Sequence, residues 1–223
     1  MMINQQETVG SFAASAPEAL PVFQKLGIDF CCGGKKPLPE ALAEKEVNPE
    51  RFEELLEEER SRKESVKRVN FSDMSSSVLS TYIEDTHHAY LRNALPEISA
   101  LLLAVLRAHG KNHGELFEVY RLFGKLKTDL EQHLIKEETL LFPALTGAGA
   151  PQAEIKPLAA EIMEEHEAAG EILEDLIRIT GAFAVPADAC LSYQRVYALL
   201  PALIEDLHTH IHLENNILLK DLG

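Results

Sequence analysis

Four histidines and two glutamates in the C-terminal two thirds of the chain have the types and spacing of metal ligands. They are His88, His133, Glu137, His166, His210 and Glu214. His133 and Glu137 are four residues apart, as are His210 and Glu214, so each pair would lie one turn apart on the same face of a helix. Imidazole nitrogens and carboxylate oxygens are donors that iron and manganese accept. The pattern therefore predicts metal chemistry.

The spacing of these residues is duplicated along the chain. His88 precedes His133 by 45 residues, and His166 precedes His210 by 44. Two such half-sites would meet in an antiparallel helical bundle with approximate twofold symmetry.

The elements that must position these side chains are four long amphipathic helices. Apolar stripes at alternating spacings of three and four residues predict helices at about 75–109, 114–144, 153–180 and 188–219. Short breaks join them, and no segment alternates as a strand does, so we expect an all-α protein with an up-down-up-down four-helix bundle. All six candidate ligands fall inside the stripes. Because an unpaired buried carboxylate is costly, six inward polar groups need a common compensating charge.

The composition of the set predicts two metal ions. If both glutamates bridge, each metal receives two histidines and two shared carboxylates, and an oxo or hydroxo bridge leaves one open position on each. A mononuclear zinc site takes three or four ligands, which makes zinc a weaker choice. A ferritin-like site uses a Glu-x-x-His motif, whereas here the histidine precedes the glutamate.

We expect different roles for the remaining histidines and for three acids near the candidate ligands. We expect that the remaining histidines are not ligands; they are His87, His109, His113, His208 and His212. Three acids lie four residues before a candidate histidine and are predicted to orient it: Glu84, Asp129 and Asp206.

A small helical domain is predicted at residues 1–65, before a bundle domain at residues 72–223. Its helices are expected at about 8–15, 17–26, 39–46 and 48–63. Adjacent thiols in the segment GIDFCCGG, Cys31 and Cys32, precede two glycines that permit a tight turn and would expose the sulfur atoms. The alternative is that they are small buried apolar side chains at a helix end. Cys190 is interpreted as structural.

The charge and the apolar pattern exclude several partners. With 21 basic and 36 acidic residues the net charge is −15, which argues against nucleic acid and disfavours an anionic membrane surface. The longest apolar run, residues 98–106, is too short to span a membrane, and no secretory signal is visible. Three cysteines do not make a disulfide scaffold, so a cytoplasmic location is expected.

The motifs resemble a known family over essentially the whole chain. The segments HHAYLRNALP, EQHLIKEETLLFP, EEHEAAG and HIHLENN, preceded by GIDFCCGG, are similar in order to the blocks of the RIC family (repair of iron centres, of the ScdA and YtfE type), whose bundle is hemerythrin-like. The resemblance implies that the six candidate ligands hold two iron ions and that Cys31 and Cys32 match the family's paired cysteines. One departure is Lys220, which stands where the second helix has Pro143, beyond the ligands.

The resemblance also implies the function. It predicts repair of iron–sulfur proteins damaged by nitrosative or oxidative stress, by supply of iron, in a protein that commonly dimerises. Two alternatives stay open: a di-iron enzyme that binds or reduces nitric oxide, and a hemerythrin-like sensor of oxygen or redox state.

Overall fold

The computed structural model describes residues 6–62, 70–147 and 152–222. In these ranges the regular secondary structure is helical, apart from one isolated bridge between Thr8 and Pro37, which confirms the all-α fold class. The chain forms two compact units, residues 80–207 and residues 1–79 with 208–223.

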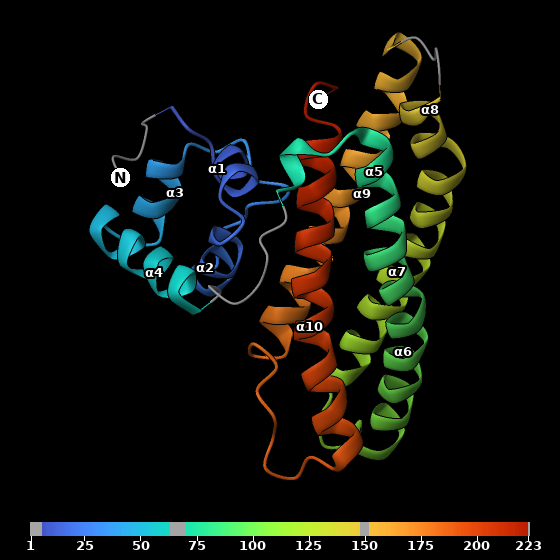
Figure 1. The fold of residues 1–223 in the computed structure, drawn as a ribbon. Coiled ribbons are helices and arrows are strands. Elements are labelled where there is room, and N and C mark those ends of the chain that lie inside the picture. The colour runs from blue at the N-terminus through green and yellow to red at the C-terminus, as the bar shows by residue number, and fades with distance from the viewer. Residues whose placement is uncertain (1–5, 63–69, 148–151, 223) are drawn as a thin grey trace. The chain divides into compact units, whose positions relative to one another are not determined.

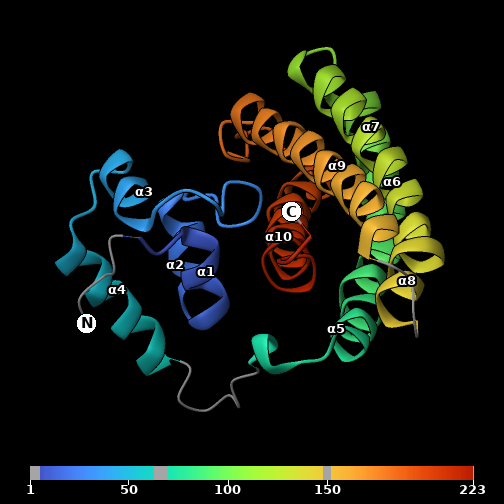
Figure 2. The same cartoon turned by 90° about the horizontal axis from the view of Figure 1, so that it is seen from above.

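Long helices make up the unit of residues 80–207. They are α6 (Ala89–His109), α7 (Glu115–Lys136), α9 (Gln152–Ile179) and the larger part of α10 (Leu191–Leu213). Figures 1 and 2 show α7 lying alongside both α6 and α9, which it contacts.

Most of the predicted apolar stripe of each of these four helices is buried in one core. The core includes Ile98 of α6, Leu126 of α7, Leu173 of α9 and Leu203 of α10. Burial of one such side chain contributes about 1.5–3 kcal/mol relative to exposure. The stripes therefore fix which face of each helix points inward, and with it the direction of the polar residues in the same register.

Three turns of π-helix interrupt the predicted helices. One is η2 (Glu84–His88), between α5 (Ser76–Ile83) and α6; another is η3 (Glu137–Leu141), between α7 and α8 (Phe142–Thr146); and η4 (Glu214–Leu218) follows α10. The sequence predicted uninterrupted helices here, because a single wide turn does not disturb an apolar pattern enough to be read. Turns of this kind are frequent at functional sites.

The other unit begins with four shorter helices, close to the predicted ranges. They are α1 (Val9–Ser15), α2 (Ala19–Leu26), α3 (Leu38–Glu44) and α4 (Pro49–Arg62), followed by the 3-10 turn η1 (Phe71–Asp73). Their separate core is aromatic: the rings of Phe12, Phe23, Phe30 and Phe52 pack with centroids 5.6–6.2 Å apart. The predicted domain boundary falls mainly on residues 63–69, outside the described residues, so it stays a prediction.

One helical stretch, Ser76–His109, is long and apolar enough to pass a length and composition test for a membrane span. The same test is passed by core helices of soluble proteins. Leu91, Leu95, Ile98, Leu102 and Val105 of this stretch belong to the bundle core. These five apolar residues therefore contribute to the core of the unit of residues 80–207.

Candidate metal centre

Glu137 lies between two histidines from different helical segments. Its Oε2 atom is 3.4 Å from Nε2 of His88, at the end of η2, and 3.3 Å from Nε2 of His133 in α7. The Nε2 atom of His166 in α9 lies 3.1 Å from that of His133. All four side chains are buried, and Glu137 is 0% exposed. Three imidazoles and one carboxylate thus converge in the bundle core.

The fourth long helix brings the last two predicted residues. The Nε2 atom of His210 lies 3.0 Å from Oε1 of Glu214, one turn away, and Glu214 is also 0% exposed. Glu137 is the first residue of η3 and Glu214 the first of η4, while His88 is the last of η2. A π-helical turn therefore starts or ends at a candidate ligand in three of the four long helices.

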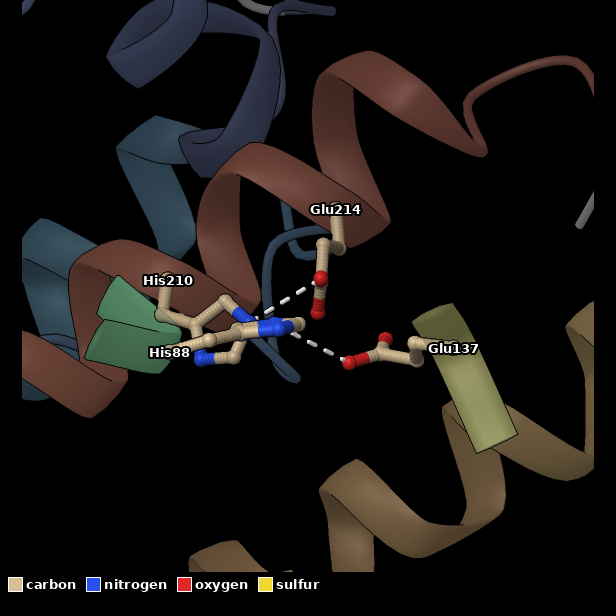
Figure 3. Close-up of side chains that lie close together, drawn as sticks. All are labelled: His88, Glu137, His210 and Glu214. Atoms are coloured by element: carbon tan, nitrogen blue, oxygen red, sulfur yellow. Dashed lines mark hydrogen bonds and ion pairs between the residues drawn. The ribbon is translucent and has the colours of Figure 1, made fainter. Parts of the chain in front are cut away.

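The six side chains form two overlapping groups of four. The ligand atoms of His88, Glu137, His210 and Glu214 lie within 4.8 Å of one another. Figure 3 shows these four side chains close together. So do those of the second group, His133, Glu137, His166 and Glu214. Both glutamates belong to both groups. The sequence predicted two histidines and two shared carboxylates for each metal, and this assignment of ligands stays a prediction.

The donor set of this cluster fits metal ions. Two carboxylates with no exposed surface, facing imidazoles rather than lysine or arginine in the contacts described above, are costly to keep ionised in an apolar core. A cation bound by nitrogen and oxygen donors offsets that cost, and iron and manganese accept this combination. The buried groups of histidine and glutamate indicate a metal site.

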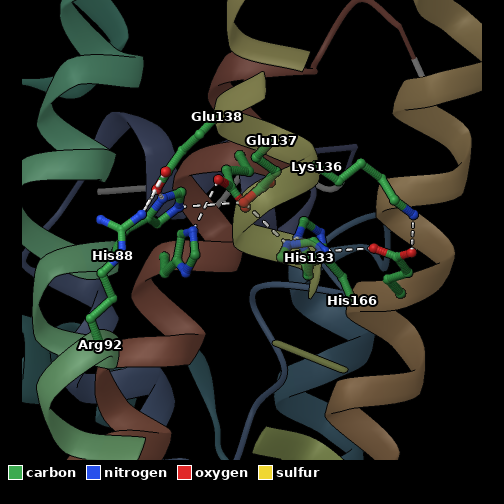
Figure 4. Close-up of polar contacts among 10 residues, drawn as sticks. His88, Arg92, His133, Lys136, Glu137, Glu138 and His166 are labelled. Atoms are coloured by element: carbon green, nitrogen blue, oxygen red, sulfur yellow. Dashed lines mark hydrogen bonds and ion pairs between the residues drawn. The ribbon is translucent and has the colours of Figure 1, made fainter. Parts of the chain in front are cut away.

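Two further carboxylates contact the Nδ1 atoms of His88 and His133. Nδ1 of His88 lies 2.7 Å from Oε1 of Glu138, which Arg92 also contacts (Figure 4). With Nδ1 bonded to a carboxylate, the Nε2 lone pair of His88 is left to face Glu137 and the cluster.

The same arrangement is repeated on the other side of Glu137. Nδ1 of His133 lies 2.7 Å from Oε2 of Glu165, which also contacts Lys136. The hydrogen bond with His133, and then Lys136, lower the pKa of Glu165 to about 2. Glu165 is therefore ionised at neutral pH and orients the His133 ring.

The acids predicted to orient these histidines have other places. Asp129 is exposed and pairs with Lys125, 2.9 Å away, and Glu84 is exposed. Asp206 contacts Nδ1 of His87 at 2.9 Å. The prediction was wrong for these contacts, because Glu84 and Asp129 are exposed to solvent and Asp206 contacts a different histidine. The observed partners, Glu138 and Glu165, reach across from a neighbouring helix.

The paired cysteines sit in a tight loop organised by Asp29. Its Oδ1 atom accepts hydrogen bonds from the backbone nitrogen of Cys31 at 2.9 Å and from its thiol at 3.2 Å, and Oδ2 accepts one from Gly33 N at 2.8 Å. A Cβ atom on Gly33 would lie 2.8 Å from that carboxylate, so the close approach requires glycine. The sulfur atoms of Cys31 and Cys32 are 3.9 Å apart.

The two sulfur atoms differ in exposure, contrary to the expectation that both are accessible. Cys31 is only 6% exposed, whereas Cys32 is half-buried. The hydrogen bond with Cys32 and burial raise the pKa of the Cys31 thiol, so it is protonated at neutral pH. The alternative drawn from the sequence, a small buried side chain, describes the position of Cys31 better than that of Cys32.

Asn216 and His212 anchor this loop within the same unit. The side-chain nitrogen of Asn216 donates to the carbonyl oxygens of Phe30 at 3.2 Å and Cys31 at 3.3 Å, and Nδ1 of His212 lies 3.3 Å from that of Phe30. A Cβ atom on Gly34 would come within 2.6 Å of Asn216 Oδ1. Burial lowers the pKa of His212 to about 4, so this ring is neutral.

The chain is similar to known proteins over nearly its whole length. Residues 5–60 match the ScdA_N family, a domain of unknown function (DUF542), and residues 80–222 match the hemerythrin HHE cation binding domain. A protein named iron-sulfur cluster repair protein YtfE from Escherichia coli O157:H7 is 33% identical, over 97% of this chain and 96% of its own length. The chain belongs to the ScdA/YtfE family.

Other members of the family are similar over the same extent. A protein named iron-sulfur cluster repair protein ScdA from Staphylococcus haemolyticus is 29% identical over 97% of this chain and 98% of its own length. A protein named probable iron-sulfur cluster repair protein from Haemophilus influenzae is 32% identical over 96% of this chain. This chain therefore joins an ScdA_N region to a region that matches the hemerythrin HHE cation binding domain.

Sequence reasoning missed several residues of this chain. His212, which is not expected to be a ligand, contacts the carbonyl oxygen of Phe30 in the cysteine loop. Glu138 and Glu165 each stand next to a predicted ligand, and that adjacency is a usable signal. A carboxylate one residue away points about 100° around the helix, toward a neighbouring helix.

Proposed function

We propose that this protein holds two iron ions and repairs iron–sulfur clusters damaged by nitrosative or oxidative stress by supplying iron to them. The observation that carries the proposal is the pair of four-residue groups sharing Glu137 and Glu214. The names of the relatives, which concern iron–sulfur cluster repair, support damaged iron–sulfur clusters as the substrate class.

The six residues would bind the two iron ions as two groups of four. His88 and His210 belong to one group, His133 and His166 to the other, and the two glutamates span both. Iron commonly takes six ligands, so four from the protein leave positions open on each ion. Open positions are what an exchangeable site needs, and they would also admit nitric oxide or oxygen as small ligands.

The protein's own side chains tune how firmly iron is held. Glu138 and Glu165 fix the rings of His88 and His133 and increase their basicity as ligands. Arg92 pairs with Glu138, and Lys136 pairs with Glu165 and helps to lower the pKa of that carboxyl. A net charge of −15 draws ferrous ions toward the protein.

We propose that the loop of Cys31 and Cys32 contacts the damaged iron–sulfur protein or receives iron. Cys32, the more exposed of the two thiols, is the first candidate for contact, since thiolates favour the iron of damaged clusters. The hydrogen bond that Asp29 accepts from Gly33 N and the one that Asn216 donates to the Cys31 carbonyl hold the loop in one conformation. We also propose that the protein is cytoplasmic and that it forms a homodimer. Light scattering of the purified chain would test the homodimer.

The experiment is reactivation of an iron–sulfur enzyme inactivated by nitric oxide or peroxide. The iron-loaded full chain should restore activity faster than the same concentration of free ferrous ion. Cys32→Ser should lower that rate, while Cys190→Ser, the matched change at an exposed thiol outside the loop, should leave it unchanged. Reactivation no faster than with free ferrous ion would contradict the proposal.

A further inference from the structure

A second set of metal-binding side chains lies away from the buried cluster, in the unit of residues 80–207. His109 ends α6, His113 lies just before α7, and Asp188 lies shortly before α10. Their ligand atoms are within 4.8 Å of one another. The two histidines are partly buried and Asp188 is exposed, so this cluster is open to solvent.

The imidazole rings of His109 and His113 lie close together at the turn between α6 and α7. The backbone nitrogen of His113 donates to the carbonyl oxygen of His109 at 3.0 Å, so the two residues lie one helical turn apart. Both rings pack edge-on against Tyr193, with centroids 5.3 Å and 5.6 Å from its ring. Because Tyr193 is 1% exposed, this support is rigid and little ordering of the imidazoles is needed for binding.

The charges around the imidazoles suit a cation. Nε2 of His113 lies 3.0 Å and 3.1 Å from the two oxygens of Asp188, and Nδ1 lies 3.3 Å from Oε1 of Glu115. No hydrogen bond joins a ring nitrogen of His109 to the rest of the chain as far as the structure describes it. A lone pair on His109, a second imidazole and a carboxylate therefore face one small region.

We propose that His109, His113 and Asp188 form an auxiliary site for a divalent first-row transition-metal ion. Two histidines and one carboxylate are a recurring set for ferrous iron and are equally acceptable to zinc and copper. Three protein ligands leave positions for water, so the ion exchanges readily. This site is separate from the proposed repair function, since none of its residues belongs to the buried cluster.

The test is a titration of the iron-loaded full chain with Zn²⁺, followed by calorimetry, with bound iron measured before and after. One further equivalent should bind while the iron content stays unchanged. Asp188→Asn and His109→Gln should each weaken it by about tenfold or more, a loss of about 1.4 kcal/mol. Asp175→Asn, an exposed carboxylate paired with Arg178, is the matched control and should not alter binding.

A second measurement identifies the ligands. Cu²⁺ bound at this site should give an electron paramagnetic resonance spectrum with hyperfine splitting from two imidazole nitrogens, reduced to one in His109→Gln. The proposal is overturned if no saturable equivalent binds below about 1 mM, a free energy of about 4 kcal/mol. It is equally overturned if binding survives both substitutions in variants whose circular dichroism and iron content match the parent chain.

Discussion

The buried His/Glu cluster and the surface site of His109, His113 and Asp188 use the same kinds of ligand in opposite surroundings. Glu137 and Glu214 have no exposed surface, whereas Asp188 is exposed. An ionised carboxylate in the core is stable only with a compensating charge, while one at the surface is already solvated by water. Burial, more than ligand type, therefore decides how strongly the stability of the ionised carboxylates depends on a bound metal.

Removal of one shared carboxylate should have the largest effect. Glu137→Gln takes a charged ligand from both groups of the buried cluster, so we expect less than one iron per chain after anaerobic loading, measured by metal analysis. Asp188→Asn should leave the iron content at its original value. If the two variants lose iron equally, the distinction between the two regions is wrong.

Metal removal should destabilise the fold through the buried cluster. A ligand at 100 times its dissociation constant stabilises a protein by about 2.7 kcal/mol per site, so two bound irons should raise Tm by roughly 10–20 °C. Differential scanning calorimetry of iron-loaded and chelator-treated chains measures this. A shift of the same size produced by saturating Zn²⁺ at the surface site alone would contradict the comparison.

The carboxylates behind the histidines should have an intermediate effect. Glu165→Gln removes the charge that orients His133, and loss of such a partner costs about 10–100-fold in metal affinity. Competition with a ferrous chelator measures the change. Asp129→Asn is the control, because that acid pairs with Lys125 at the surface, and an equal loss there would argue against the role of Glu165.

The smallest of the four effects concerns the anchor of the cysteine loop. Asn216→Ala removes two hydrogen bonds to the loop carbonyls of Phe30 and Cys31, each worth about 1 kcal/mol. Cys31 should then react several-fold faster with a thiol reagent, followed by mass spectrometry of the labelled peptides. Exposed Cys190 serves as the internal reference, and an unchanged ratio of the two rates would show that Asn216 does not anchor the loop.

The sequence predicted the elements that follow from an apolar period and from repeated spacing. The four stripes place Ile98, Leu126, Leu173 and Leu203 in one core, and the polar residues in their register face the same way. Contacts between helices were beyond this reasoning. Glu138 and Glu165 reach histidines 50 and 32 residues away, and their partners depend on how the helices pack.

The surface site and the loop anchor could not be predicted for a related reason. His113 and Asp188 are 75 residues apart, and Asn216 and Phe30 are 186 apart, so no local pattern joins them. The turns of π-helix at His88, Glu137 and Glu214 were also missed. A single wide turn changes the direction of a side chain without changing the residue types on either side.

Metal analysis with Mössbauer spectroscopy of the anaerobically ⁵⁷Fe-loaded chain measures whether the six inward residues hold two irons. We expect two irons per chain, in two environments of similar nitrogen and oxygen ligation. His88→Ala and His166→Ala should each alter a different one of these environments. A single iron per chain, or two irons that survive both substitutions unchanged, would contradict it.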